Sequence, residues 1–206
     1  MTMAPRTFEQ IEDAARGLRK RLRIDALLSP DLISALGQLS DVIPGFELVR
    51  ARDDELPDCE AQADCPNNKI TLRENVYQAA LRGEGRARMT IAHELGHLVL
   101  GHSAIRLRAI GIDRSARFSR RTRAEESEAK RFAAAFLVPT HLAQNCLSAE
   151  ELIEKFQISR EAAEIRIGQL EAYARRAAGV RRDLPTSVID FLSAAKRRGH
   201  QVTSLD

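Results

Sequence analysis

Five residues, His93-Glu94-Leu95-Gly96-His97, constrain this chain more than any other stretch of its 206 residues. Two histidines four positions apart on an α-helix lie about 40° apart around the axis and roughly 6 Å along it. Both imidazoles can therefore share one metal ion, while the carboxylate of Glu94 can reach a water molecule on that ion. The pattern predicts a zinc hydrolase site in which His93 and His97 are ligands and Glu94 is the general base.

The residues around the motif favour the helix that this geometry requires. Ile91, Leu95 and Leu98 are apolar at helical spacing, and Gly101 follows as a C′ residue that can end the helix. The same five-residue pattern also occurs by chance in chains that bind no metal. Its position inside an apolar, helical run is what leads us to expect metal binding here.

Composition excludes several classes of protein. No apolar run approaches the length of a membrane span, and the first residues lack the apolar stretch of a signal peptide, so we expect a cytoplasmic protein with no membrane partner. The formal net charge is only +3, and the clustered arginines are weak support for a nucleic-acid partner. The three cysteines form no metal-type pair and predict reduced thiols.

Local patterns predict several helices and one hairpin. Capping boxes at Thr7–Gln10 and Ser148–Glu151 open helices, and helical periodicity returns from Glu125 to the stop at Pro139. Residues 59–65 and 69–73 alternate apolar and polar side chains on either side of a Pro-Asn-Asn turn, which predicts a hairpin. Its second strand is expected to be an edge beside the metal, where an extended peptide could add as a further strand.

A catalytic zinc usually has three protein ligands and keeps its fourth position for water. His102 is the nearest candidate, but it follows His97 by five positions rather than the six of the long metzincin pattern, and the glycine is misplaced. The helix that begins at Glu125 offers carboxylates instead. Glu128 borders its apolar face and can point into a cleft, Glu125 could support the site from a second layer, and Glu126 is expected to face solvent.

Between these two helices lies a stretch with little periodicity, Gly101 to Arg123, which carries seven arginines. Such loops are usually solvated, and that is the simpler interpretation of residues 103–124. The alternative is a mobile flap over the cleft that helps to select an acidic or DNA-associated substrate.

The two motifs together resemble the ImmA/IrrE family of metallo-endopeptidases. The resemblance rests on His93-Glu94-Leu95-Gly96-His97 followed by residues 126–139, Glu-Ser-Glu-Ala-Lys-Arg-Phe-Ala-Ala-Ala-Phe-Leu-Val-Pro. It extends over roughly residues 8 to 172. Phe136 and Val138 stand where the family often has Leu and Met, and the loop between the motifs is long.

The resemblance implies a fold and a chemistry. The fold would be α+β, a mainly helical zincin-like peptidase over residues 1–146 with a small antiparallel sheet beside the active helix, and a helical subdomain over residues 147–206. One Zn²⁺ per chain would be held by His93, His97 and, from the family's second motif, Glu128. An oxyanion donor is also needed, and Tyr77, His102 and His141 are the candidates.

Relatives in this family are similar to regulators that cleave helix-turn-helix repressors, which makes a DNA-binding repressor the expected substrate. Two other functions stay open. The helices from Ser148 to Tyr173, with Arg160 and Arg166 on the second, could bind DNA, although ordinary packing against the peptidase domain is favoured. The chain could also be a metal-binding regulator or antitoxin-type partner with little peptidase activity.

Overall fold

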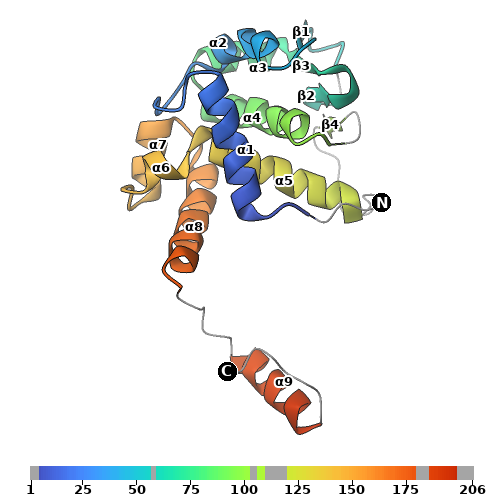
Figure 1. The fold of residues 1–206 in the computed structure, drawn as a ribbon. Coiled ribbons are helices and arrows are strands. Elements are labelled where there is room, and N and C mark those ends of the chain that lie inside the picture. The colour runs from blue at the N-terminus through green and yellow to red at the C-terminus, as the bar shows by residue number, and fades with distance from the viewer. Residues whose placement is uncertain (1–4, 57–58, 103–105, 110–119, 180–185, 199–206) are drawn as a thin grey trace. The chain divides into compact units, whose positions relative to one another are not determined.

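A computed structural model describes residues 5–56, 59–102, 106–109, 120–179 and 186–198 (Figure 1). The helices are α1 (Phe8–Arg21), α2 (Leu32–Gly37), α3 (Glu74–Leu81), α4 (Gly85–Val99), α5 (Arg120–Leu137), α6 (Thr140–Ala143), α7 (Ala149–Phe156), α8 (Arg160–Ala177) and α9 (Thr186–Arg197). The strands are β1 (Glu47–Ala51), β2 (Cys59–Asp64), β3 (Lys69–Arg73) and β4 (Arg106–Ala109), and two short 3-10 helices are η1 (Leu39–Asp41) and η2 (Cys65–Asn67). The expected α+β, mainly helical class is confirmed.

The four strands form one sheet in the order β1-β3-β2-β4. The predicted hairpin is confirmed, because β2 and β3 pair antiparallel across a turn in which Asn68 has a left-handed φ of 49°. Two expectations about the sheet are wrong. It is mixed, since β1 runs parallel to β3, and β3 is an interior strand because β1 covers its other side. The edges among the described strands are β1 and β4.

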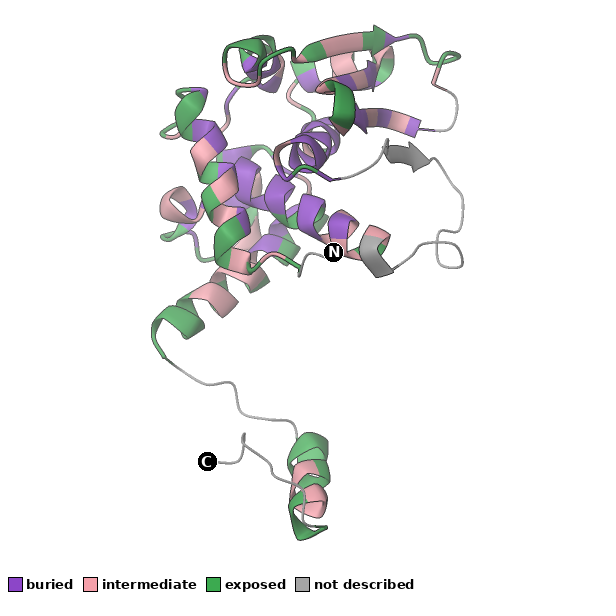
Figure 2. Cartoon of the chain, turned by 45° about the vertical axis from the view of Figure 1, so that its right-hand side comes forward, coloured by how far each residue is buried: buried purple, intermediate pink, exposed green. Residues whose placement is uncertain are grey.

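Helices α4 and α5 lie side by side beneath the sheet and form the centre of the core (Figures 1 and 2). Their contact is close because small residues face each other. A Cβ atom on Gly96 would lie 3.0 Å from the Ala129 carbonyl oxygen and 3.2 Å from Phe132 Cβ. Gly96 therefore allows the backbone of α5 to approach the two histidines of α4 closely.

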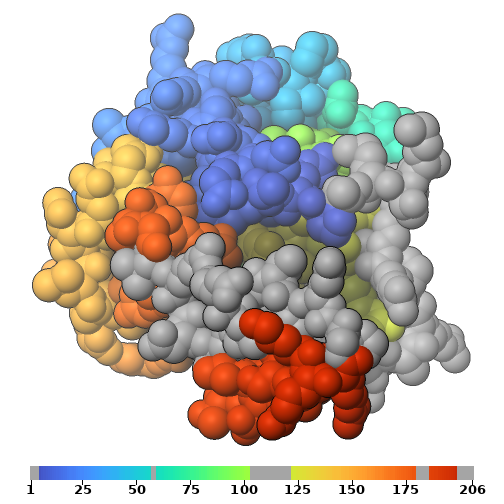
Figure 3. Space-filling model, turned by 60° about the horizontal axis from the view of Figure 1, so that its bottom comes forward, coloured from blue at the N-terminus to red at the C-terminus, as the bar shows by residue number. Residues whose placement is uncertain are grey.

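Helix α1 packs on α5 from another side (Figure 3). Its buried residues are Ile11, Ala15, Leu18 and Arg19, and its start is fixed by the predicted capping box. In that box Thr7 Oγ1 accepts from the Gln10 backbone N–H, and the Gln10 side chain accepts from the Thr7 backbone N–H. The segment just before α1 is thereby held beside α5, where it meets the site described below.

The stretch between α4 and α5 is only partly described. Arg106–Ala109 form β4, which pairs antiparallel with β2, so this part of the predicted loop is a strand. Helix α5 begins at Arg120, earlier than predicted. The rest of the arginine-rich stretch, residues 103–105 and 110–119, lies outside the described residues. The interpretation of this stretch as a flap therefore stays a prediction.

Contacts divide the chain into two compact units, Met1–Gly168 and Gln169–Asp206. The domain boundary expected after residue 146 stays a prediction. In the first unit Ser148 caps α7 as predicted, with its side chain accepting from the Glu151 backbone N–H. In the second, α9 exposes Phe191. Within the described part of the chain, no helix is both long and apolar enough to cross a membrane.

Candidate metal centre

Helix α4 presents His93 and His97 to each other across one turn. Both side chains are buried, with His97 fully enclosed. Their Nε2 atoms are 3.0 Å apart, and the two rings are nearly perpendicular at 77°. The separation of four residues predicted that these nitrogens would meet, and they do. Glu94 follows His93 directly in α4 and is also buried, at 1% exposure.

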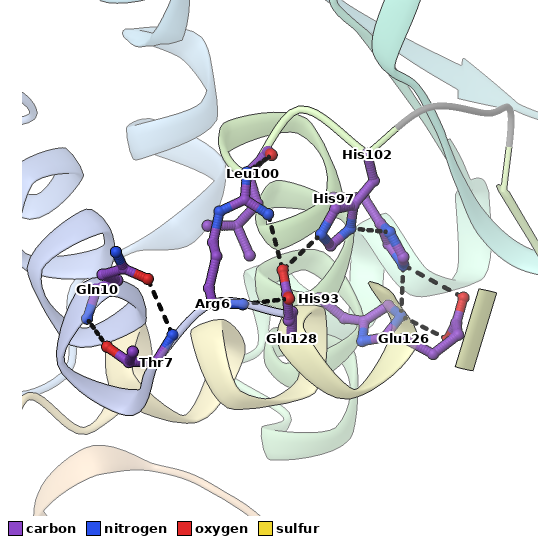
Figure 4. A network of polar contacts seen from close by, with 9 residues as sticks. All are labelled: Arg6, Thr7, Gln10, His93, His97, Leu100, His102, Glu126 and Glu128. Carbon is purple, nitrogen blue, oxygen red and sulfur yellow. Dashed lines mark hydrogen bonds and ion pairs between the residues drawn. The ribbon is translucent and has the colours of Figure 1, made fainter. Parts of the chain in front are cut away.

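Helix α5 brings one carboxylate to this histidine pair, and it belongs to Glu126. Its Oε2 lies 3.4 Å from His93 Nε2, and its Oε1 lies 3.4 Å from His97 Nε2 (Figure 4). Zinc binds such nitrogen and oxygen atoms at about 2.0–2.2 Å in a tetrahedron, whose edges are then about 3.3–3.6 Å. The two contacts of 3.4 Å match such an edge, the 3.0 Å between the Nε2 atoms is shorter, and the three donor groups are of the chemical types that zinc binds.

The expectation for the second helix was different, and the structure corrects it. Glu128 was expected to face the cleft and Glu126 to face solvent. The carboxylate of Glu128 instead contacts Arg6 and His102, while Glu126 is the one beside the two histidines. Among the described residues, the group that could hold a metal ion is His93, His97 and Glu126.

The reason lies in how α5 is surrounded. Helix α5 does not have a single buried face, because every residue from Phe132 to Val138 is buried. Glu126 precedes Ala129 by three positions and Ala133 by seven, which places it about 60° and 20° from them around the axis. It therefore belongs to the stripe that faces α4. That spacing was the sequence signal that could have identified it.

Glu128 lies on a different side of α5 and takes part in a chain of polar contacts that ends at His97 (Figure 4). The Arg6 backbone N–H donates to its Oε1 at 2.8 Å, and Arg6 Nη1 donates to its Oε2 at 2.7 Å. The same Oε2 lies 3.3 Å from His102 Nε2. His102 Nδ1 in turn lies 2.8 Å from His97 Nδ1. No sequence pattern indicated Arg6, which lies 122 positions before Glu128.

The ionisation of these groups follows from their neighbours. Burial would raise the pKa of Glu126, but hydrogen bonds from His93 and His97 outweigh it and lower the pKa. Burial likewise opposes ionisation of Glu128, and the backbone N–H and guanidinium of Arg6 reverse it, so its pKa is also lowered. Burial, aided by His97, lowers the pKa of His102 to about 4 despite the nearby Glu128. The carboxylates are thus charged, as a metal site requires.

The remaining predicted site residues lie as follows. Glu125 is buried on α5. Tyr77, on α3, has the Arg50 guanidinium 4.2 Å from its ring centroid. His141 Nε2 lies 3.4 Å from Asp25 Oδ1. Of the three predicted oxyanion donors, only His102 is in contact with the histidine pair.

The two arginines considered for DNA binding, Arg160 and Arg166, differ in their surroundings. Arg166 is fully buried, and its Nη1 lies 2.6 Å from Glu12 Oε1. Its guanidinium also donates to the Val138 carbonyl. Arg160 is exposed and pairs with Glu150. Arg166 therefore packs inside the domain, which favours the packing interpretation over a DNA-binding surface.

The α+β fold and an H-E-x-x-H helix paired with a carboxylate helix define a zincin-like protein. The chain belongs to the family described as Peptidase_M78, IrrE N-terminal-like domain, whose model matches residues 64–168. The family expected from the sequence is thereby confirmed, and it is a family of metallopeptidases.

Among solved structures, a Mycobacterium tuberculosis transcriptional regulator is similar in fold. The TM-score is 0.50 and the identity 16%, over 75% of this chain and 45% of the regulator. The chain thus spans less than half of that protein's length, and at this identity the likeness concerns the fold alone. No curated protein matches this chain.

Proposed function

We propose that this protein is a zinc-dependent endopeptidase that holds one zinc ion per chain through His93, His97 and Glu126. The observation that carries the proposal is the trio of donor groups from α4 and α5, spaced at 3.0 and 3.4 Å. Membership of a peptidase family supports it. When bound, zinc supplies Lewis acidity toward the scissile carbonyl and lowers the pKa of water at its open position.

Glu94 is the proposed general base. It accepts the proton of the attacking water and delivers it to the nitrogen of the leaving amine, so one carboxyl group serves both steps. Its place in α4, directly after one ligand and three residues before the other, keeps it beside the zinc without making it a ligand. A buried carboxylate is also shielded from solvent protons and counter-ions, which suits this role.

The proposed substrate is a DNA-binding repressor of the helix-turn-helix class, which the enzyme would meet in the cytoplasm. Support comes from the sequence resemblance to the ImmA/IrrE peptidases, whose relatives are similar to regulators that cleave helix-turn-helix repressors. On this proposal cleavage releases genes of a stress response or a mobile element.

The test uses the zinc-loaded protein and purified repressors encoded beside its gene. Mass spectrometry of the products should show a cut repressor with the natural protein, and none with Glu94→Gln, which keeps the size of the side chain but cannot accept the proton. Zinc content should be the same in both proteins. Cleavage that persists in Glu94→Gln contradicts the proposed mechanism.

Two other outcomes favour the alternative functions. Substoichiometric zinc, or biological function that is undiminished in Glu94→Gln, indicates a metal-binding regulator without peptidase activity. Salt-dependent binding of DNA by the full chain indicates a nucleic-acid-binding role. The burial of Arg166 makes the second outcome the less expected one.

A further inference from the structure

We infer that Arg6, Glu128 and His102 are positioning residues that fix the tautomer of His97 and leave its Nε2 atom free to bind the metal. The inference rests on the proposed metal centre and adds a function for residues outside it. Arg6 lies before the matched family region, residues 64–168, so the contact that begins the chain is not part of that match.

The direction of each hydrogen bond follows from the chemistry of the groups. An ionised carboxylate only accepts, so His102 Nε2 must carry the proton in its 3.3 Å contact with Glu128 Oε2. A neutral imidazole has one donor nitrogen and one acceptor, and His102 Nδ1 is therefore the acceptor. At 2.8 Å from it, His97 Nδ1 must donate. In the zinc-bound protein the lone pair of His97 is then on Nε2, where the metal would take the place of the hydrogen bond to Glu126.

Arg6 holds the beginning of this chain in place. It donates to both oxygens of Glu128 through its backbone N–H and its Nη1, and its Nη2 donates to the Leu100 carbonyl at the C-terminal end of α4. Glu128 is buried, and so is His102. Rotation of the carboxylate is therefore restricted by two donors of one residue, and the polar contacts tie three segments of the chain together: the N-terminal segment, α4 and α5.

Without the Glu128 carboxylate, neither His102 nor His97 would be held in one tautomer. Without an acceptor at Nε2, His102 can carry its proton on Nδ1 instead, which then faces the His97 proton. His97 would move its own proton to Nε2, the atom that the metal needs. Partners that orient a metal-binding histidine in this way typically contribute about 10–100-fold to metal affinity.

The main variant is Glu128→Met, which keeps the length of the side chain but removes the acceptor. Competition with a chromophoric chelator, using zinc alone as the probe, should show affinity lowered by about 10–100-fold. Glu128→Gln retains an acceptor oxygen and should recover part of the loss. The matched control is Glu12→Met, which removes the partner of buried Arg166 but leaves the contacts of His97 intact, and should not change zinc affinity.

A measurement on the unaltered protein guards against variants that do not fold. In the zinc-loaded protein, two-dimensional ¹H–¹⁵N NMR of labelled histidines should show His97 protonated on Nδ1 and His102 on Nε2. His102 protonated on Nδ1, or His97 without a proton on Nδ1, would overturn the inference, as would unchanged zinc affinity in a folded Glu128→Met protein. Neither readout depends on cleavage, so a protein with these properties that cuts nothing would refute the proposed peptidase function alone.

Discussion

Replacement of Gly96 by alanine tests the close contact between α4 and α5. The new Cβ atom would lie 3.0 Å from the Ala129 carbonyl oxygen, 3.1 Å from Ala129 Cα and 3.2 Å from Phe132 Cβ. Two of these are backbone atoms of α5 and cannot rotate away. The whole helix must therefore shift by a few tenths of an ångström, and overpacking of this kind costs about 1–3 kcal/mol.

An opposing term must be subtracted, because alanine is the better helix former. Glycine in a helix interior is about 1 kcal/mol less favourable than alanine. The net change in the free energy of unfolding of Gly96→Ala is thus a loss of about 0–2 kcal/mol. Gly17→Ala is the matched control, since Gly17 lies inside α1 and its Cβ would meet nothing within 4 Å. It should gain about 0.5–1 kcal/mol.

Urea unfolding of the zinc-free proteins measures the difference in the free energy of unfolding between the two variants, which should be about 0.5–3 kcal/mol. Chelator competition should add a second effect, weaker zinc binding in Gly96→Ala alone, because the shift of α5 moves Glu126. If Gly96→Ala is as stabilising as Gly17→Ala and binds zinc normally, the close contact does not position Glu126.

Two further predictions concern stability. Arg166→Met should lower the free energy of unfolding by about 3–5 kcal/mol, because Glu12 and the Val138 carbonyl lose a buried donor, whereas Arg160→Met should have little measurable effect because its pair with Glu150 is exposed; equal effects in urea unfolding would refute this. Removal of zinc with EDTA should lower the free energy of unfolding by about 2.7 kcal/mol, relative to protein with free zinc at a hundred times its Kd. An unchanged urea midpoint after EDTA would contradict a zinc site that exists only in the folded protein.

Much of this fold could be predicted from local sequence patterns. The capping boxes at Thr7 and Ser148 gave the starts of α1 and α7, and the alternation on either side of Asn68 gave the hairpin. Gly101 ends α4 with a left-handed φ of 64°, as a C′ residue should. Each of these features depends on residues a few positions apart, which is why the sequence is sufficient for them.

The features that could not be predicted depend on distant partners. Strand β3 is interior because β1 pairs beside it, which its own alternation does not reveal. Arg6 contacts Glu128 from 122 positions away, which no local pattern indicates. The selection of Glu126 was readable in part from its spacing to Ala129 and Ala133. The rest of the reason is that α5 is enclosed on several sides, which is a property of the packed structure and not of its local sequence.

The central claim is that Glu126 completes a metal centre with His93 and His97. A crystal structure of the zinc-loaded protein, with data collected on both sides of the zinc absorption edge, tests it most directly. The account predicts one anomalous peak per chain within about 2.0–2.2 Å of both Nε2 atoms and a Glu126 carboxylate oxygen. A zinc ion bound by Glu128 or His102 in place of Glu126 would contradict it.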